Sequence, residues 1–167
     1  WRAARDAVSL YSQRYADSPR LVVVRMQDAL TLLVRGELAR QESEVGAAGA
    51  PSLEEARRQL RYAIDLLESL NEEVARQLRR PGRAGPPGAL SESELLSLQK
   101  NIRYQLARAF RNQAQSYPVD SADRVNSLTR ALLQLAPLVR SATEETMAWR
   151  SRIDQIICHR LLKKYEA

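Results

Sequence analysis

The chain has 167 residues, of which 44% are hydrophobic and 28% charged, and it carries a formal net charge of +6. This length is typical of one domain, and this composition is typical of a globular protein with its own core. No apolar run approaches the roughly 18 residues that a membrane span needs, so we expect none. A single cysteine, Cys158, excludes an internal disulfide.

Aromatic residues make up only 5% of the chain, so the core must consist mostly of Leu, Ala, Val and Ile. Such side chains suit close packing between helices. The first residue is Trp1 rather than an initiator Met. We therefore expect residues 1–167 to form a single helical domain that belongs to a longer chain.

Almost every cation is an arginine, because the chain contains only three lysines. One explanation is a compositional bias that places Arg on solvated helix faces. The other is an anionic partner, since the guanidinium group binds carboxylates and phosphates well. The sequence is consistent with both explanations.

Apolar residues recur with helical spacing along the whole chain, whereas strand signals are nearly absent. Six helices are predicted, over residues 1–16, 19–43, 52–80, 91–117, 120–136 and 141–165. The connections are mostly short, which predicts antiparallel neighbours. Two loops are rich in Gly or Pro, at residues 46–51 and 81–90. We expect the second of these to be exposed and flexible.

Start and stop signals support these helices in chain order. The first carries Tyr11 and Tyr15 on its apolar side. Pro19 suits the first turn of the second helix, after a capping Ser18. The third begins with a capping box in which Glu55 follows Ser52 by three residues.

The last three helices have similar signals. The fourth begins with a second capping box, formed by Ser91 and Glu94. Asp120 or Ser121 is expected to cap the fifth, and Pro137 to end it. A third capping box, over residues 141–144, opens the sixth.

A recurring pattern of small and bulky residues resembles the second helix of the tetratricopeptide repeat family. The matching residues are Ala7, Tyr11 and Pro19, then Ala56, Leu60 and Ala63, then Leu128, Ala131 and Pro137. Looser matches to the family's first helix are Met26, Ala29, Leu30 and Leu33, then Arg103, Leu106, Ala107 and Phe110, then Trp149, Arg152, Ile153 and Ile156. The strict repeat period is absent, because Ala7 and Ala56 are 49 residues apart.

The resemblance implies an all-α solenoid fragment of six antiparallel helices stacked as repeats. It also implies that the chain binds a protein or peptide in a groove lined by the first helix of each pair. By the family's spacing, the groove residues are Gln27, Thr31, Arg35, Asn101, Tyr104, Arg108, Arg111 and Asn112. Amides suit a peptide backbone, and the two arginines of the fourth helix suit carboxylates, so an acidic segment is expected. Both end helices are expected to expose apolar stripes.

Catalytic signals are weak. Cys158 and His159 are adjacent in one helix, so their side chains diverge by about 100° and cannot form a nucleophile–base dyad. No metal-ligand spacing and no phosphate-binding glycine loop is present. We therefore expect a non-enzymatic protein without a cofactor.

Two other functions remain open. The basic runs around Arg57–Arg61 and Arg76–Arg83 raise nucleic-acid binding, although acidic residues of the same helix offset their charge. The second alternative is a structural spacer within a larger protein, in which the groove binds nothing specific.

Overall fold

The computed structural model describes residues 1–46, 48–79, 87–140 and 146–163. Within these ranges the chain forms six α-helices and no strand. They are α1 (Arg2–Arg14), α2 (Leu21–Glu44), α3 (Leu53–Leu78), α4 (Glu92–Gln115), α5 (Ala122–Arg140) and α6 (Thr146–Leu161). The all-α prediction is confirmed. None of the described helices is both long and apolar enough to cross a membrane.

Capping side chains begin three of these helices as predicted. The Ser52 hydroxyl accepts a hydrogen bond from the Glu55 amide at 3.1 Å. At the start of α4 the capping box is complete, because the Ser91 amide also donates to the Glu94 carboxylate at 2.7 Å. Of the two candidates before α5, Ser121 accepts from the Arg124 amide. The box expected at residues 141–144 lies outside the described residues.

Two predicted helix boundaries are wrong. Helix α2 begins at Leu21 rather than Pro19, because the Leu21 amide first closes a turn onto the Ser18 carbonyl at 3.0 Å. Helix α5 passes through Pro137 and ends at Arg140. Proline there removes only one hydrogen bond near the helix end, and Leu138 is buried, which holds the last turn in helical form.

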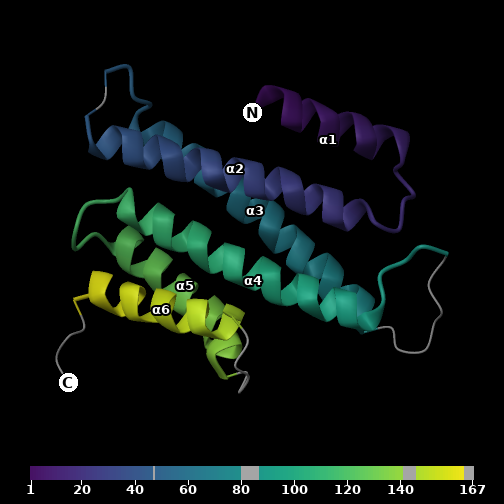
Figure 1. The fold of residues 1–167 in the computed structure, drawn as a ribbon. Coiled ribbons are helices and arrows are strands. Elements are labelled where there is room, and N and C mark those ends of the chain that lie inside the picture. The colour runs from purple at the N-terminus through teal and green to yellow at the C-terminus, as the bar shows by residue number, and fades with distance from the viewer. Residues whose placement is uncertain (47, 80–86, 141–145, 164–167) are drawn as a thin grey trace.

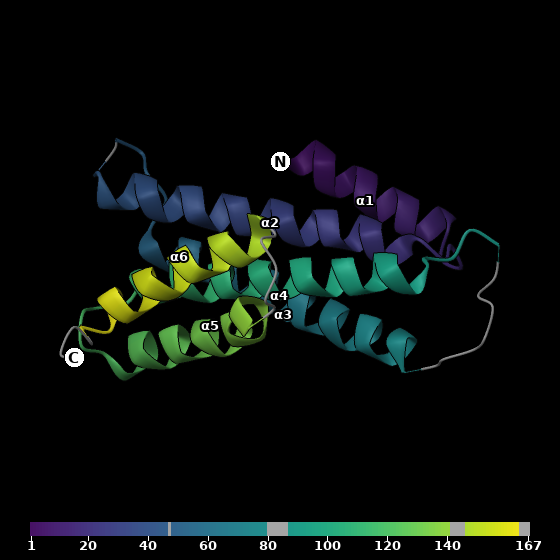
Figure 2. The same cartoon turned by 60° about the horizontal axis from the view of Figure 1, so that its bottom comes forward.

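The loops join antiparallel neighbours, and each helix packs mainly on the helices before and after it in sequence. Helix α4 also contacts α2 on one side and α6 on the other in one layer, whereas the backbones of α3 and α5 do not meet. Figure 1 shows α3 and α5 passing behind that layer, with α1 and α6 at opposite ends of the row. Figure 2, turned from that view, keeps α1 and α6 apart in the same way. The predicted flexible loop at 81–90 lies largely outside the described residues.

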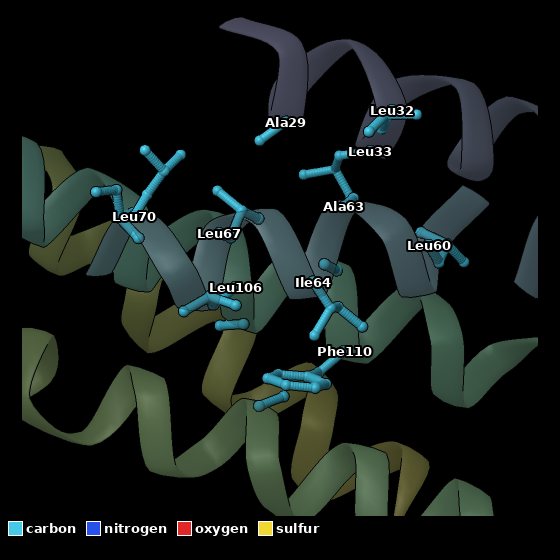
Figure 3. Packing of buried hydrophobic residues seen from close by; sticks show 14 of the residues in the cluster. Ala29, Leu32, Leu33, Leu60, Ala63, Ile64, Leu67, Leu70, Leu106 and Phe110 are labelled. Atoms are coloured by element: carbon cyan, nitrogen blue, oxygen red, sulfur yellow. The ribbon is translucent and has the colours of Figure 1, made fainter. Parts of the chain in front are cut away.

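The core is centred on α3, which is buried from both sides. Figure 3 shows leucines of α3 pointing toward α2 on one side, and Ile64 toward Phe110 of α4 on the other. The fully buried apolar side chains of α3 are Ala56, Leu60, Ala63, Leu67, Leu70 and Val74. Burying a leucine contributes about 2 kcal/mol, so this helix supplies much of the stabilisation.

Helices α2 and α3 cross closely at Gly36. A Cβ atom built on Gly36 would lie 2.7 Å from Leu60 Cγ and 3.2 Å from the Leu60 amide nitrogen. No real Cβ atom tolerates the shorter distance, so this position needs glycine for packing. The sequence pattern did not mark it.

The two end helices are less buried. No residue of α1 is buried. Helix α6 buries small or polar residues, namely Ala148, Ser151, Asp154 and Cys158. Its larger apolar side chains Trp149, Ile153 and Ile156 are 56%, 56% and 68% exposed. At the α6 end, the expected exposed apolar stripe is therefore present.

Candidate functional site

The junction between α2 and α4 contains a network of charged and amide side chains. Arg108 binds Glu37 with two nitrogens, one of them at 2.7 Å. The same Glu37 accepts a hydrogen bond from the Asn112 amide at 2.6 Å. The Asn112 side-chain oxygen in turn accepts from Arg40, which also binds Glu44. Two of the predicted groove residues, Arg108 and Asn112, thus hold α2 against α4.

The junction between α4 and α6 is built around a second ion pair. Arg111 binds Asp154, which is only 8% exposed. Burial raises the pKa of the nearby Tyr104 hydroxyl, and the Asp154 charge raises it further. A hydrogen bond to the Asp154 side chain raises it as well, so the Tyr104 hydroxyl is already engaged within the protein. Arg111, a third predicted groove residue, is committed to joining two helices.

The sequence alone did not identify the acids in these junctions. Glu37 is one of four acidic residues of α2, so its position in the sequence does not distinguish it. Asp154 carried a weak signal, because it is the only acid among the described residues of α6. Only the packing of α2 on α4, and of α4 on α6, shows which arginine each carboxylate neutralises.

The predicted groove residues of α2 do not lie beside the predicted groove residues of α4. Arg35 follows Asp28 by seven residues, which places both on one side of the helix. Asp28 pairs with Arg5 of α1, so this side faces α1 rather than α4. Thr31 donates its hydroxyl to the Gln27 carbonyl of its own helix. Gln27 itself is exposed.

A small cleft of about 270 Å³ lies between α4 and α6. We call it the inner cleft, and it is lined by Asn101, Tyr104, Gln105, Thr146, Met147 and Arg150. Asn101 and Tyr104 are predicted groove residues that remain partly exposed, and Asn101 accepts a hydrogen bond from Gln105 at 3.3 Å. Arg150 is exposed and makes no ion pair with the described residues. The structure thus brings two of the eight predicted residues together at a cleft.

The first basic run does not form an open cationic surface. Arg57 donates to the Ser116 carbonyl at 2.6 Å and to Glu54 at 3.0 Å. Arg61 also binds Glu54, at 2.8 Å. These two hydrogen bonds lower the pKa of Glu54, that from Arg61 most. The carboxylate is therefore ionised and offsets both cations. The second run extends into residues 80–86, outside the described part.

Side chains suited to catalysis are separated from one another. Cys158 is buried, whereas the adjacent His159 points about 100° away and is exposed. Burial raises the pKa of the Cys158 thiol from 9.0 to about 11, which keeps it protonated. No group of three metal-ligating side chains gathers anywhere in the described ranges.

Known proteins provide no guide to the site. No family model, no curated protein and no solved structure matches this chain. A functional proposal therefore rests on the geometry of the residues themselves.

Proposed function

We propose that this protein is a non-catalytic scaffold that binds a segment of another protein in the inner cleft. The proposal includes a tetratricopeptide-like arrangement, in which α2, α4 and α6 are the first helices of successive pairs. The contacts within that layer support this arrangement, because α2 meets α4 and α4 meets α6. The repeat period in the sequence is irregular, so the chain is not assigned to the tetratricopeptide repeat family.

The inner cleft is the observation that carries the proposal. Its volume of about 270 Å³ is below the range usual for small-molecule pockets, but it has room for one or two side chains of a partner. Tyr104 offers an aromatic ring, and Asn101 offers an amide for a peptide backbone. A protein segment uses such a set of groups better than a small substrate does.

An arginine other than those predicted from the sequence supports an acidic partner segment. Arg108 and Arg111 are neutralised by Glu37 and Asp154, so their charge is not available to a partner. Arg150 lines the same cleft and is exposed. We assign to Arg150 the role of binding a carboxylate of the partner segment.

A selection from a random peptide library tests the proposal. Peptides are selected on the wild-type protein and counter-selected on the double variant Asn101→Ala/Tyr104→Ala, and their affinities are then measured by fluorescence anisotropy. We expect enrichment of Asp and Glu, and a loss of about tenfold or more in the double variant. Tyr62→Ala is the matched control, because Tyr62 is an equally aromatic, 56% exposed residue on α3. It should leave binding unchanged.

The spacer function and the nucleic-acid-binding function predict different results in these measurements. If no peptide is enriched, or if enriched peptides bind the double variant equally well, the cleft is not a binding site and the spacer function is favoured. Binding of single-stranded RNA with log affinity falling steeply against log salt would instead indicate a nucleic-acid-binding protein.

A further inference from the structure

A helix at the edge of a domain usually buries its large apolar side chains, whereas α6 exposes three of them. Its buried side consists of Ala148, Ser151, Asp154 and Cys158, and its exposed side carries a tryptophan and two isoleucines. Trp149, Ile153 and Ile156 follow the i, i+4, i+7 spacing of one helical face, and we call them the outer stripe. Each of these three side chains is more than half exposed, although Arg152 of the same helix stacks on the Trp149 ring.

The equivalent face of α4 shows what such a stripe is used for. Ala107 and Phe110 stand at the same spacing as Ile153 and Ile156, and both are buried. Helix α5 covers this face, and its Arg130 lies 4.2 Å from the centre of the Phe110 ring. The same kind of face is thus covered by another helix at α4 and left open at α6.

The charges around the outer stripe define the chemistry of what would cover it. Arg152 stacks 4.8 Å above the Trp149 ring, and Arg160 extends the stripe by one helical turn beyond Ile156. The only acid among the described residues of α6 is Asp154, which is buried and paired with Arg111. The exposed side of α6 is therefore apolar in its centre and positive at its edges.

We propose that the outer stripe binds a second protein through an amphipathic α-helix whose apolar face is flanked by Asp or Glu. Ile and Trp side chains supply the apolar contact, and Arg152 and Arg160 pair with the flanking carboxylates. This surface is distinct from the inner cleft, and the inference goes beyond the function proposed above.

A second copy of this chain fits the stripe less well. Two α6 helices packed face to face would place Arg152 and Arg160 of both copies in one interface, and the described residues of α6 contain no exposed acid to offset them. Helix α1 of a second copy is also basic, with Arg2, Arg5 and Arg14 against a single Asp6. Charge complementarity therefore favours a different, acidic helix.

Designed peptides test this proposal with Trp149 as the reporter. A Trp1→Phe variant leaves Trp149 as the sole tryptophan, since the chain has two. The probe is a tryptophan-free helical peptide with Leu on one face and Glu on both flanks. The controls are the same peptide with Lys in place of Glu, and a scrambled peptide of the same composition. We expect a blue shift of Trp149 emission with the Glu peptide, and affinity weaker by about tenfold or more with either control.

Variants of the protein separate the stripe from other surfaces. Ile153→Ser/Ile156→Ser should weaken the Glu peptide by about tenfold or more while the helical circular dichroism stays unchanged, because both residues are exposed. Leu133→Ser is the matched control, since Leu133 is 65% exposed on α5 and lies outside the stripe. It should not alter binding, and neither should Asn101→Ala/Tyr104→Ala in the inner cleft.

Three results would overturn the proposal. The first is equal binding of the Glu, Lys and scrambled peptides. The second is a dimer in sedimentation that disappears in the Ile153→Ser/Ile156→Ser variant, which would make a second copy the occupant. The third is a stripe-dependent blue shift on phosphatidylserine vesicles with no binding of the Glu peptide, which would make the stripe a membrane-binding surface.

Discussion

At the scale of single residues, the charged side chains at the helix junctions have a structural role. Arg108 and Arg111 were candidates for ligand binding, but each is paired with a carboxylate of a neighbouring helix. Removing one partner of such a pair leaves the other without compensation in a half-buried position. These residues therefore affect stability before they affect binding.

Glu37→Gln should lower the free energy of unfolding by about 1–2 kcal/mol, because Arg108 and the buried Asn112 lose their shared acceptor charge. Urea unfolding followed by circular dichroism measures the loss. Arg61→Gln is the control, since its pair with Glu54 is largely exposed, and it should cost clearly less than Glu37→Gln. Equal losses in the two variants would contradict the structural role of Glu37.

Cys158 is the only thiol of the chain and provides a second measurement at this scale. Because burial raises its pKa from 9.0 to about 11, the thiolate fraction near pH 8 is about a hundredfold smaller than for an ordinary thiol. We expect iodoacetamide to label the native protein slowly, with a rate that still rises above pH 9. The control is Ser69→Cys/Cys158→Ala, which moves the thiol to an exposed site on α3. Equally fast labelling of both proteins would contradict this environment.

At the scale of the helices, the sequence patterns predicted what depends on local chemistry. Ser52 and Ser91 marked two helix starts correctly, because a cap needs only residues close in sequence. The predicted capping box is complete only at Ser91, since the Glu55 carboxylate binds Arg58 and Gln59 instead of the Ser52 amide. Pro137 was misleading, since the burial of Leu138 outweighs the preference of proline to end a helix. The close crossing at Gly36 was missed, because it depends on where Leu60 of another helix lies.

Gly36→Ala tests that crossing. Alanine favours helix by about 1 kcal/mol, but its Cβ would overlap Leu60, so we expect a net loss of about 1–3 kcal/mol in unfolding free energy. Removing most of the Leu60 side chain should relieve the overlap. In a Leu60→Ala background, Gly36→Ala should therefore be less costly than in the wild type. A stabilising Gly36→Ala would show that α2 and α3 are not this close.

At the scale of the whole molecule, the structure is a row of helices that contact mainly their neighbours in sequence. This order follows from the short connections, and the sequence predicted it correctly. The candidate site was harder to predict. The spacing of residues on α4 identified the face, but not that Arg108 and Arg111 are paired there, nor that Arg35 faces α1. Such pairings depend on distant parts of the chain.

A row of this kind should be unequally stable along its length. Helix α1 has no buried residue, whereas α3 is buried on both sides. We expect the amides of α1 to exchange with deuterium faster than those of α3 by about a hundredfold or more. Hydrogen exchange read by mass spectrometry measures this difference. Uniform protection across both helices would indicate that the chain opens only as one unit.

The two ion pairs that link α2, α4 and α6 determine how this layer of helices responds to salt. Each spans one seam between helices of the same layer, Glu37 with Arg108 and Arg111 with Asp154. Because both pairs are largely buried, salt screens them much less than it screens ion pairs at the surface. The relative position of α2, α4 and α6, and with it the width available to a partner that lies across them, should therefore change little with ionic strength.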